Sequence, residues 1–158
     1  MDPRFEKIYK DNSKYVYNVA LGMLRNRDEA EDIMQNVFIK LFENYGSFRG
    51  DADIKTYLYR MTVNKTIDYM RSQNLHSNKL EFMEQPGPQK TDSSVSLLDS
   101  LLDRLNPELK APILLAEIGG FSYKEISEIM NINLGTVKSR INRGIAKLRE
   151  YADKEALL

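Results

Sequence analysis

One polar, proline-containing segment divides this chain, and apolar residues recur at helical spacing on both sides of it. The segment holds the runs Gln85-Pro86-Gly87-Pro88-Gln89 and Thr91-Asp92-Ser93-Ser94, a composition typical of linkers that let flanking domains sit tens of ångströms apart. No stretch alternates as a strand would, and the short run Ile113-Leu114-Leu115-Ala116 is bounded like a helix. These features predict an all-α protein of two small helical domains, residues 1–73 and 95–158, joined by a flexible linker over residues 74–94.

Three helices are expected in the first domain. Asp2-Pro3 suits the cap and first position of a helix reaching about residue 25, with Asn12-Ser13 as a point where it could break. Asp28, followed three residues later by Glu31, predicts the start of a second helix with a regular apolar stripe. A loop over residues 44–53 then precedes a third helix from Ile54 to about Arg71.

The second domain is expected to open with a short helix from Val95 to Leu105 whose leucines face inward. Asn106-Pro107 caps the next helix, which extends to about Ile118, and Pro112 within it predicts a kink or a late start. Ser122 and Glu125 then form a capping box at the start of another helix. This helix stops near Asn131 and a last one begins at Leu134, which is the pattern of a helix-turn-helix.

The last helix presents a basic face. No acidic residue lies between Asn131 and Arg149, and its polar positions carry Lys138, Arg140, Arg143 and Lys147. A solvated amphipathic helix is the alternative interpretation, but such faces normally mix charges of both signs. A face of one sign suits a polyanion, and a helix of this kind can lie in the major groove of DNA.

Charge is segregated along the chain although the net charge is zero, with 23 basic and 23 acidic residues. Carboxylates dominate between Asp28 and Glu43, and cations dominate between Lys55 and Arg71. Two tyrosines on the second of these segments, Tyr57 and Tyr59, are candidates for stacking on bases as well as for ordinary core positions. The pattern predicts one acidic and two basic partner surfaces.

Residues for metal, thiol or phosphate chemistry are scarce. The chain has no cysteine and one histidine, His76, in the expected linker. Asp28, Glu31 and Asp32 could share a helix face and hold Mg²⁺, but helix-capping acids are the commoner case. No cofactor, catalytic residue or enzymatic activity is therefore expected. No apolar run reaches the roughly 20 residues of a membrane helix and the N-terminus lacks a signal-peptide core, so a cytoplasmic location is expected.

Several motifs, in order, resemble those of the extracytoplasmic-function (ECF) sigma factors of bacterial RNA polymerase. Residues 28–38, DEAEDIMQNVF, are similar to the family's D-A-E-D-[IL]-x-Q-[ED]-x-F signature, and residues 48–71 to its F-R-G and T-W-L-Y-R segments. In the second half, GFSYKEI at residues 120–126 and GTVKSR at residues 135–140 match the family's helix-turn-helix. GTVKSR also occurs in other helix-turn-helix families, so the resemblance to sigma factors depends on all of these motifs occurring together, in this order and at this spacing.

The resemblance implies a sigma region 2 helical bundle, and a four-helix region 4 domain with the helix-turn-helix. Region 2 would bind the clamp helices of the polymerase β′ subunit through Asp32, Gln35, Asn36 and Phe38. It would recognise and melt the promoter −10 element through Phe48, Arg49, Asp51, Lys55, Thr56, Tyr57, Arg60, Asn64, Lys65 and Arg71. Region 4 would contact the −35 element through Thr136, Lys138, Ser139, Arg140, Asn142 and Arg143.

The implied partners are core RNA polymerase, including its β flap, promoter DNA and, as for many members, an anti-sigma protein, which no residue of the sequence identifies. Tyr57 stands where the family usually has Trp, Asn36 replaces an acid, and Asn142 leaves the promoter sequence unassigned. Two alternatives stay open: a stand-alone helix-turn-helix regulator, and a carboxylate-metal hydrolase built on Asp28, Glu31 and Asp32.

Overall fold

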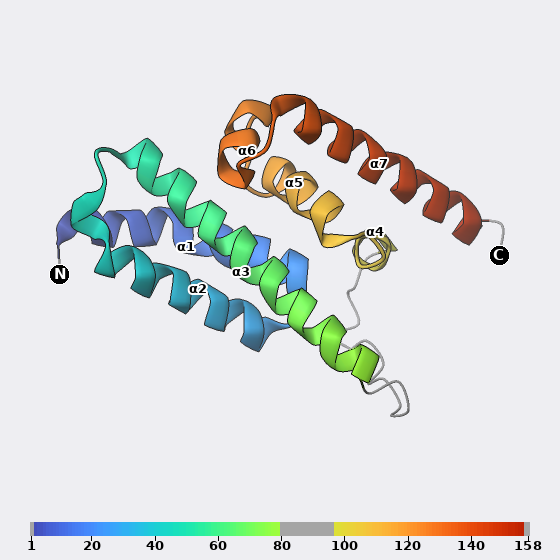
Figure 1. Cartoon of the computed structure of the whole chain (residues 1–158), viewed down its shortest axis with the longest axis horizontal. Helices are drawn as coiled ribbons and strands as arrows, with labels where there is room; N and C mark the ends of the chain where they lie inside the picture. Colours follow the sequence, from blue (N-terminus) through green and yellow to red (C-terminus); the bar gives the residue numbers. More distant parts are fainter. Residues whose placement is uncertain (1, 80–96, 157–158) are drawn as a thin grey trace.

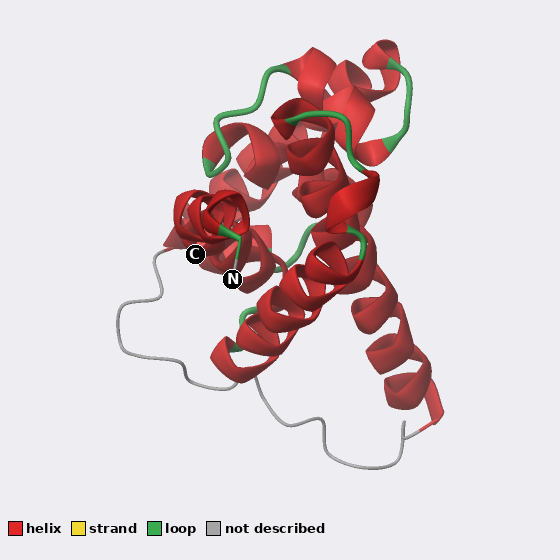
Figure 2. Ribbon diagram, turned by 90° about the vertical axis from the view of Figure 1, so that its left-hand side faces the viewer, coloured by secondary structure: helices red, strands yellow, loops and turns green. Residues whose placement is uncertain are grey.

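The computed structural model describes residues 2–79 and 97–156, with the side chains of residues 51–53 and 74–79 left out. All regular structure in these residues is helical (Figure 2). The helices are α1 (Pro3–Leu24), α2 (Arg27–Glu43), the 3-10 turn η1 (Tyr45–Ser47), α3 (Asp51–Lys79), α4 (Leu97–Leu102), α5 (Pro107–Glu117), α6 (Tyr123–Met130) and α7 (Leu134–Ala156). None of the described helices combines the length and apolar character needed to cross a bilayer. We call α1–α3 the N-module and α4–α7 the C-module.

Helix α1 begins where the sequence predicts. The Asp2 carboxylate accepts a hydrogen bond from the Arg4 backbone N–H at 2.8 Å, and Pro3 occupies the first turn. The Asn12-Ser13 pair does not break the helix, which continues to Leu24. The side-chain amide of Asn12 donates to the Ile8 carbonyl, one turn earlier, at 3.0 Å. The helix ends at Leu24, and its C-cap Arg25 has a left-handed backbone with a φ of 56°.

Two boundaries in the N-module differ from the prediction. Helix α2 is capped by Asn26, whose side chain accepts from the Glu29 N–H at 3.1 Å, so Asp28 lies inside the first turn and is not the cap. Helix α3 begins earlier than Ile54 and continues past Arg71 to Lys79, beyond the predicted linker start. No Gly or Pro occurs between Asp51 and Lys79, so the polar residues that suggested a linker do not stop the helix. His76 therefore falls within α3.

In the C-module, the predicted caps of α5 and α6 are confirmed. Asn106 accepts from the Glu108 N–H at 3.0 Å, and Ser122 and Glu125 make the reciprocal capping box. Helix α5 begins at Pro107 and runs through Pro112, so the helix does not start late. The short helix α4 differs from expectation in its packing, because Leu97 and Leu98 are 60% and 56% exposed while Leu101 is buried.

The two modules pack on each other (Figure 1). Helix α5 lies between α1 of the N-module and α7 of the C-module, and α6 lies against α3. Gly22 of α1 permits the close approach of α5, since a Cβ atom there would lie 3.0 Å from the Leu114 side chain. The sequence features describe the modules singly and did not predict this arrangement.

Candidate nucleic-acid interface

The outer face of α2 carries the first group of predicted site residues. Asp32, Gln35 and Asn36 are exposed and lie on one side of the helix, since they are separated by three or four residues. Ile39 continues this face and is 55% exposed. Sequence reasoning missed Ile39, although an isoleucine outside the regular apolar stripe of α2 is a signal that could have found it. Together these four residues make a mixed polar and apolar surface on α2, which we call the α2 face.

Phe38 does not belong to the α2 face. Its side chain is 4% exposed and packs edge-on against Tyr9, with ring centroids 4.8 Å apart. The prediction that Phe38 contacts a partner is therefore corrected: its ring packs between α2 and α1. The reason is its place in the apolar stripe between Val37 and Leu41, which the helical period turns toward α1.

Phe48 of the segment before α3 and Tyr57 of α3 form an aromatic pair. The ring of Phe48 lies 4.8 Å from that of Tyr57, centroid to centroid, and both are half-buried, while Arg49 beside them is exposed. Thr56 is half-buried next to Tyr57, and Asp51 marks the first residue of α3. Of the residues predicted for base binding, the structure thus brings Phe48 and Tyr57 into contact. Aromatic rings at a surface of this kind are suited to stacking on unpaired bases.

Tyr59 does not join this pair. It is 1% exposed and packs edge-on against Phe121 of the C-module at 4.7 Å, and its hydroxyl donates to the Asn12 side chain at 3.4 Å. The hypothesis that Tyr59 stacks on bases is wrong for this arrangement, because two residues along a helix turn the side chain by about 200° from Tyr57.

Three cations of α3 contact the C-module. The Arg60 guanidinium donates to the backbone carbonyls of Ile129, at 3.1 Å, and Glu128, both at the end of α6. Lys55 lies over the Phe121 ring, 4.9 Å from its centroid, and Arg71 pairs with Glu108 at 3.2 Å. Asn64 is exposed and lines a small pocket that includes Arg71, and Lys65 is half-buried.

The last helix presents its predicted residues outward. Val137 and Ile141 are buried on its inner side, while Lys138, Ser139, Asn142 and Arg143 are exposed and Thr136 and Arg140 are half-buried. The capping box fixes the preceding helix, and the hydrogen bonds from Ser122 to the Glu125 carboxylate lower the pKa of Glu125. The exposed positions of α7 therefore form a basic surface that follows a capped helix.

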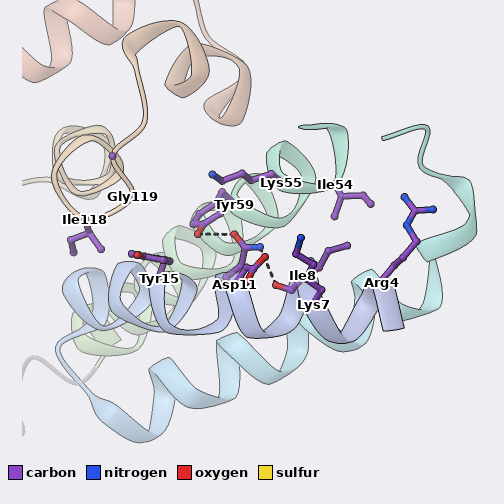
Figure 3. Close-up of a pocket in the computed structure, with 12 residues that line it drawn as sticks. Arg4, Lys7, Ile8, Asp11, Tyr15, Ile54, Lys55, Tyr59, Ile118 and Gly119 are labelled. Carbon is purple, nitrogen blue, oxygen red and sulfur yellow. Dashed lines mark hydrogen bonds between the residues drawn. The ribbon is translucent and has the colours of Figure 1, made fainter. Parts of the chain in front are cut away.

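A cleft of about 720 Å³ lies between the modules (Figure 3). Arg4 and Lys7 of α1 and Lys55 of α3 line one part of it, and Tyr15, Ile118 and Gly119 line the other. Asp11 is the acidic residue in this lining. The cleft shows that the module interface is not tightly packed along its whole length.

A cluster of ion pairs around the buried Lys110 joins the modules at the other end of α1. Lys110 of α5 is 2% exposed, and its ammonium lies 3.4 Å from the Met23 carbonyl and 3.3 Å from the Asp103 carboxylate. Arg25 lies 3.4 Å from Asp99 and 3.3 Å from Asp103. Burial lowers the pKa of Lys110, and the Asp103 carboxylate opposes this effect. Sequence reasoning missed this cluster; a lysine inside the apolar run of α5 was the available signal.

Among the residues that the structure describes, no group of three or more His, Cys, Asp or Glu side chains is arranged to hold a metal ion. Asp28, Glu31 and Asp32 of α2, the metal ligands of the alternative hypothesis, are among the residues that form no such group.

Comparison with protein families places both modules. The sequence model of the Sigma-70 region 2 family matches residues 8–75, and that of the Sigma-70 region 4 family matches residues 96–148. The chain is 33% identical to the ECF RNA polymerase sigma factor SigE of Mycolicibacterium smegmatis, over 98% of this chain and 63% of that protein. It is 35% identical to the ECF sigma factor SigW of Bacillus subtilis, over 90% of this chain and 84% of that protein.

Solved structures share the fold. The sigma factor RpoE of Bartonella quintana, in complex with the anti-sigma factor NepR, superposes with a TM-score of 0.77 at 22% identity and covers 95% of this chain and 97% of its own. CnrH, in complex with the cytosolic domain of CnrY, gives a TM-score of 0.70 at 20% identity, covering 95% of this chain and 88% of its own.

Proposed function

Since the chain belongs to the ECF sigma factors of bacterial RNA polymerase, we propose that it binds core polymerase and directs promoter-specific initiation of transcription. The α2 face meets the polymerase, with the β′ clamp helices as its docking site and the β flap as a further contact of the C-module. Phe48, Tyr57 and the α3 cations receive the −10 element, and the basic surface of α7 receives the −35 element. The chain acts in the cytoplasm with polymerase, and no catalytic step is assigned to it.

The observation that carries this proposal is the separation of surfaces within the N-module. The α2 face is polar and apolar, which suits a protein partner, whereas the aromatic pair and the cations lie on α3 and the loop before it and suit an unpaired, negatively charged strand. Melting a duplex costs a few kcal/mol, which stacking on Phe48 and Tyr57 and contacts from Arg60 would offset. A chain with both surfaces can hold polymerase and strand at once.

A stand-alone helix-turn-helix regulator accounts for the C-module alone. It leaves the region 2 match over residues 8–75 without a role, so we do not favour it. An anti-sigma partner is part of the proposal, supported by the complex of the related RpoE with NepR.

Co-purification with core RNA polymerase tests the docking surface. Ile39→Asp and Asp32→Lys should each reduce recovery of the chain on immobilised core enzyme by tenfold or more, because they remove apolar area and reverse charge at the centre of the α2 face. Asp28→Lys is the matched control, since Asp28 is also an exposed acid of α2 but lies at its first turn. Equal losses in all three variants, or none, would contradict the assignment of the α2 face.

A further inference from the structure

The cleft between the modules has no role in the proposed function. Its volume of about 720 Å³ lies within the range of pockets that bind small organic ligands, and such pockets commonly form where two modules meet. Helix α1 supplies one wall, and the start of α3 and the residues that follow α5 supply the rest (Figure 3). Several charged side chains line these walls, so a polar ligand suits the cleft better than an apolar one.

The side chains on the α1 wall follow a definite order along the helix. Lys7 follows Arg4 near the N-terminal end, Asp11 lies one turn beyond Lys7, and Tyr15 lies one turn beyond Asp11 (Figure 3). Because these positions are three or four residues apart, they share one face of α1. From Arg4 to Tyr15 this face spans about 16 Å, at about 1.5 Å per residue. The wall therefore offers cations at one end and an aromatic ring at the other.

The cationic end suits phosphate groups. Lys7 is exposed, and Lys55 of α3 lines the same cleft from the opposite side. The Lys55 ammonium lies 4.9 Å from the centroid of the Phe121 ring, which holds it beside the cleft. Ammonium groups act as compact charges for phosphate oxygens, and two of them on different helices can contact one polyphosphate from both sides.

The rest of the α1 wall suits a sugar and a base. A carboxylate is the acceptor that many nucleotide sites use for ribose hydroxyls, and Asp11 lies between Lys7 and the ring of Tyr15. The Tyr15 side chain is 47% exposed, and Ile118 of the C-module lines the same end of the cleft. An exposed ring near an apolar side chain provides a stacking surface for a base. The order along α1 is thus that of phosphate, ribose and base.

We propose that this cleft binds a nucleoside diphosphate or triphosphate, with its phosphates at Lys7 and Lys55, its ribose at Asp11 and its base on Tyr15. The inference depends on the geometry of the cleft and does not need the promoter surfaces, so it stands or falls apart from the proposed function. The ligand contacts both modules, because Ile118 belongs to the C-module and the other named residues to the N-module.

Isothermal titration of the full chain with ATP and with GTP tests the assignment. The tighter-binding nucleotide should bind about fivefold or more tightly than its nucleoside, which lacks phosphate, and than inorganic triphosphate, which lacks ribose and base. Absence of binding by both nucleotides at millimolar concentration would overturn the proposal. Equal affinity for inorganic triphosphate would do so too, because it would leave only a cationic patch.

Variants of exposed α1 residues test the placement of the ligand. Lys7→Gln and Tyr15→Ser should each weaken nucleotide binding by about fivefold or more. Asp11→Ala should reduce the preference for the nucleotide over its 2′,3′-dideoxy analogue, which lacks the ribose hydroxyls. Lys14→Gln is the matched control, since Lys14 is also an exposed cation of α1 but does not line the cleft; it should change the affinity by less than about twofold.

The basic surface of α7 is the competing site for a phosphate ligand. Arg143 is exposed on that surface, so Arg143→Gln should leave nucleotide binding unchanged. A loss in Arg143→Gln as large as that in Lys7→Gln, or equal losses in Lys7→Gln and Lys14→Gln, would overturn the cleft as the site. The proposed function fails by a different result, the loss of co-purification with core polymerase, which Lys7→Gln and Tyr15→Ser should retain.

Discussion

Lys110 illustrates how one side chain can take a role that its residue type does not suggest. A lysine in an apolar helix is an unfavourable choice for a core. Lys110 of α5 is enclosed where α5 meets α1, with the Asp103 carboxylate and the Met23 carbonyl as partners. Arg25, which also pairs with Asp103, adds a like charge nearby. The cost of removing an ammonium from water is thus only partly offset.

Replacing Lys110 with methionine tests this balance by its pH dependence. Burial holds the folded-state pKa of Lys110 below 10.5, so the unfolded chain binds this proton more readily, and wild-type stability rises with pH across the window up to about 10.5. At pH 7, Lys110→Met should be as stable as wild type or more stable by about 1–3 kcal/mol. This advantage should shrink toward pH 10.5 in urea denaturation. If the stability advantage of Lys110→Met grew with pH, or if the variant were less stable than wild type by the same amount at every pH, the lowered pKa of Lys110 would be contradicted.

Single residues also show where sequence reasoning reached its limit. Phe38 and Ile39 are neighbours in the chain, and the motif pointed to Phe38 as a contact, yet the structure buries Phe38 and exposes Ile39. A motif marks residues that a family needs, whether for packing or for binding, and the helical period is what separates the two uses.

The helices themselves were largely predictable because their ends are set by local chemistry. Asp2-Pro3, Asn106-Pro107 and the Ser122–Glu125 box each satisfy backbone groups within a few residues. The predictions were wrong where a neighbouring residue competed, as Asn26 did with Asp28, and where polar composition was taken as a stop, as in the last turns of α3. Side-chain caps are visible in sequence, but the choice between adjacent caps depends on packing.

Removal of the α6 cap should therefore have a measurable and specific cost. Ser122→Ala loses the hydroxyl acceptor of the Glu125 N–H, and should lower the free energy of unfolding by about 1 kcal/mol. Ser127→Ala, in the same helix, removes a hydroxyl that bonds only to the Lys124 carbonyl, and should be neutral or slightly stabilising. Urea denaturation at neutral pH distinguishes the two variants. Equal changes in the free energy of unfolding would show that the Ser122 cap does not stabilise the protein.

At the scale of the whole molecule, the two modules were predictable and their docking was not. Each module has its own motifs, caps and apolar stripes, which are local in the chain. The contacts of Arg60 with the end of α6 join residues 69 and 68 positions apart, and no periodicity or composition encodes such a pair. The sequence suggested two widely separated domains, whereas the structure shows one folded unit with a shared interface.

Reconstituted transcription tests the central claim most directly: that this chain gives RNA polymerase its promoter specificity. Purified chain, bacterial core RNA polymerase and fragmented genomic DNA of the source organism would be combined, and the 5′ ends of the transcripts sequenced. We predict transcripts that start at a small set of sites, share upstream −10 and −35 sequences, and disappear when the chain is omitted or carries Ile39→Asp. Absence of chain-dependent start sites, together with tight dimeric binding to an operator without polymerase, would contradict it.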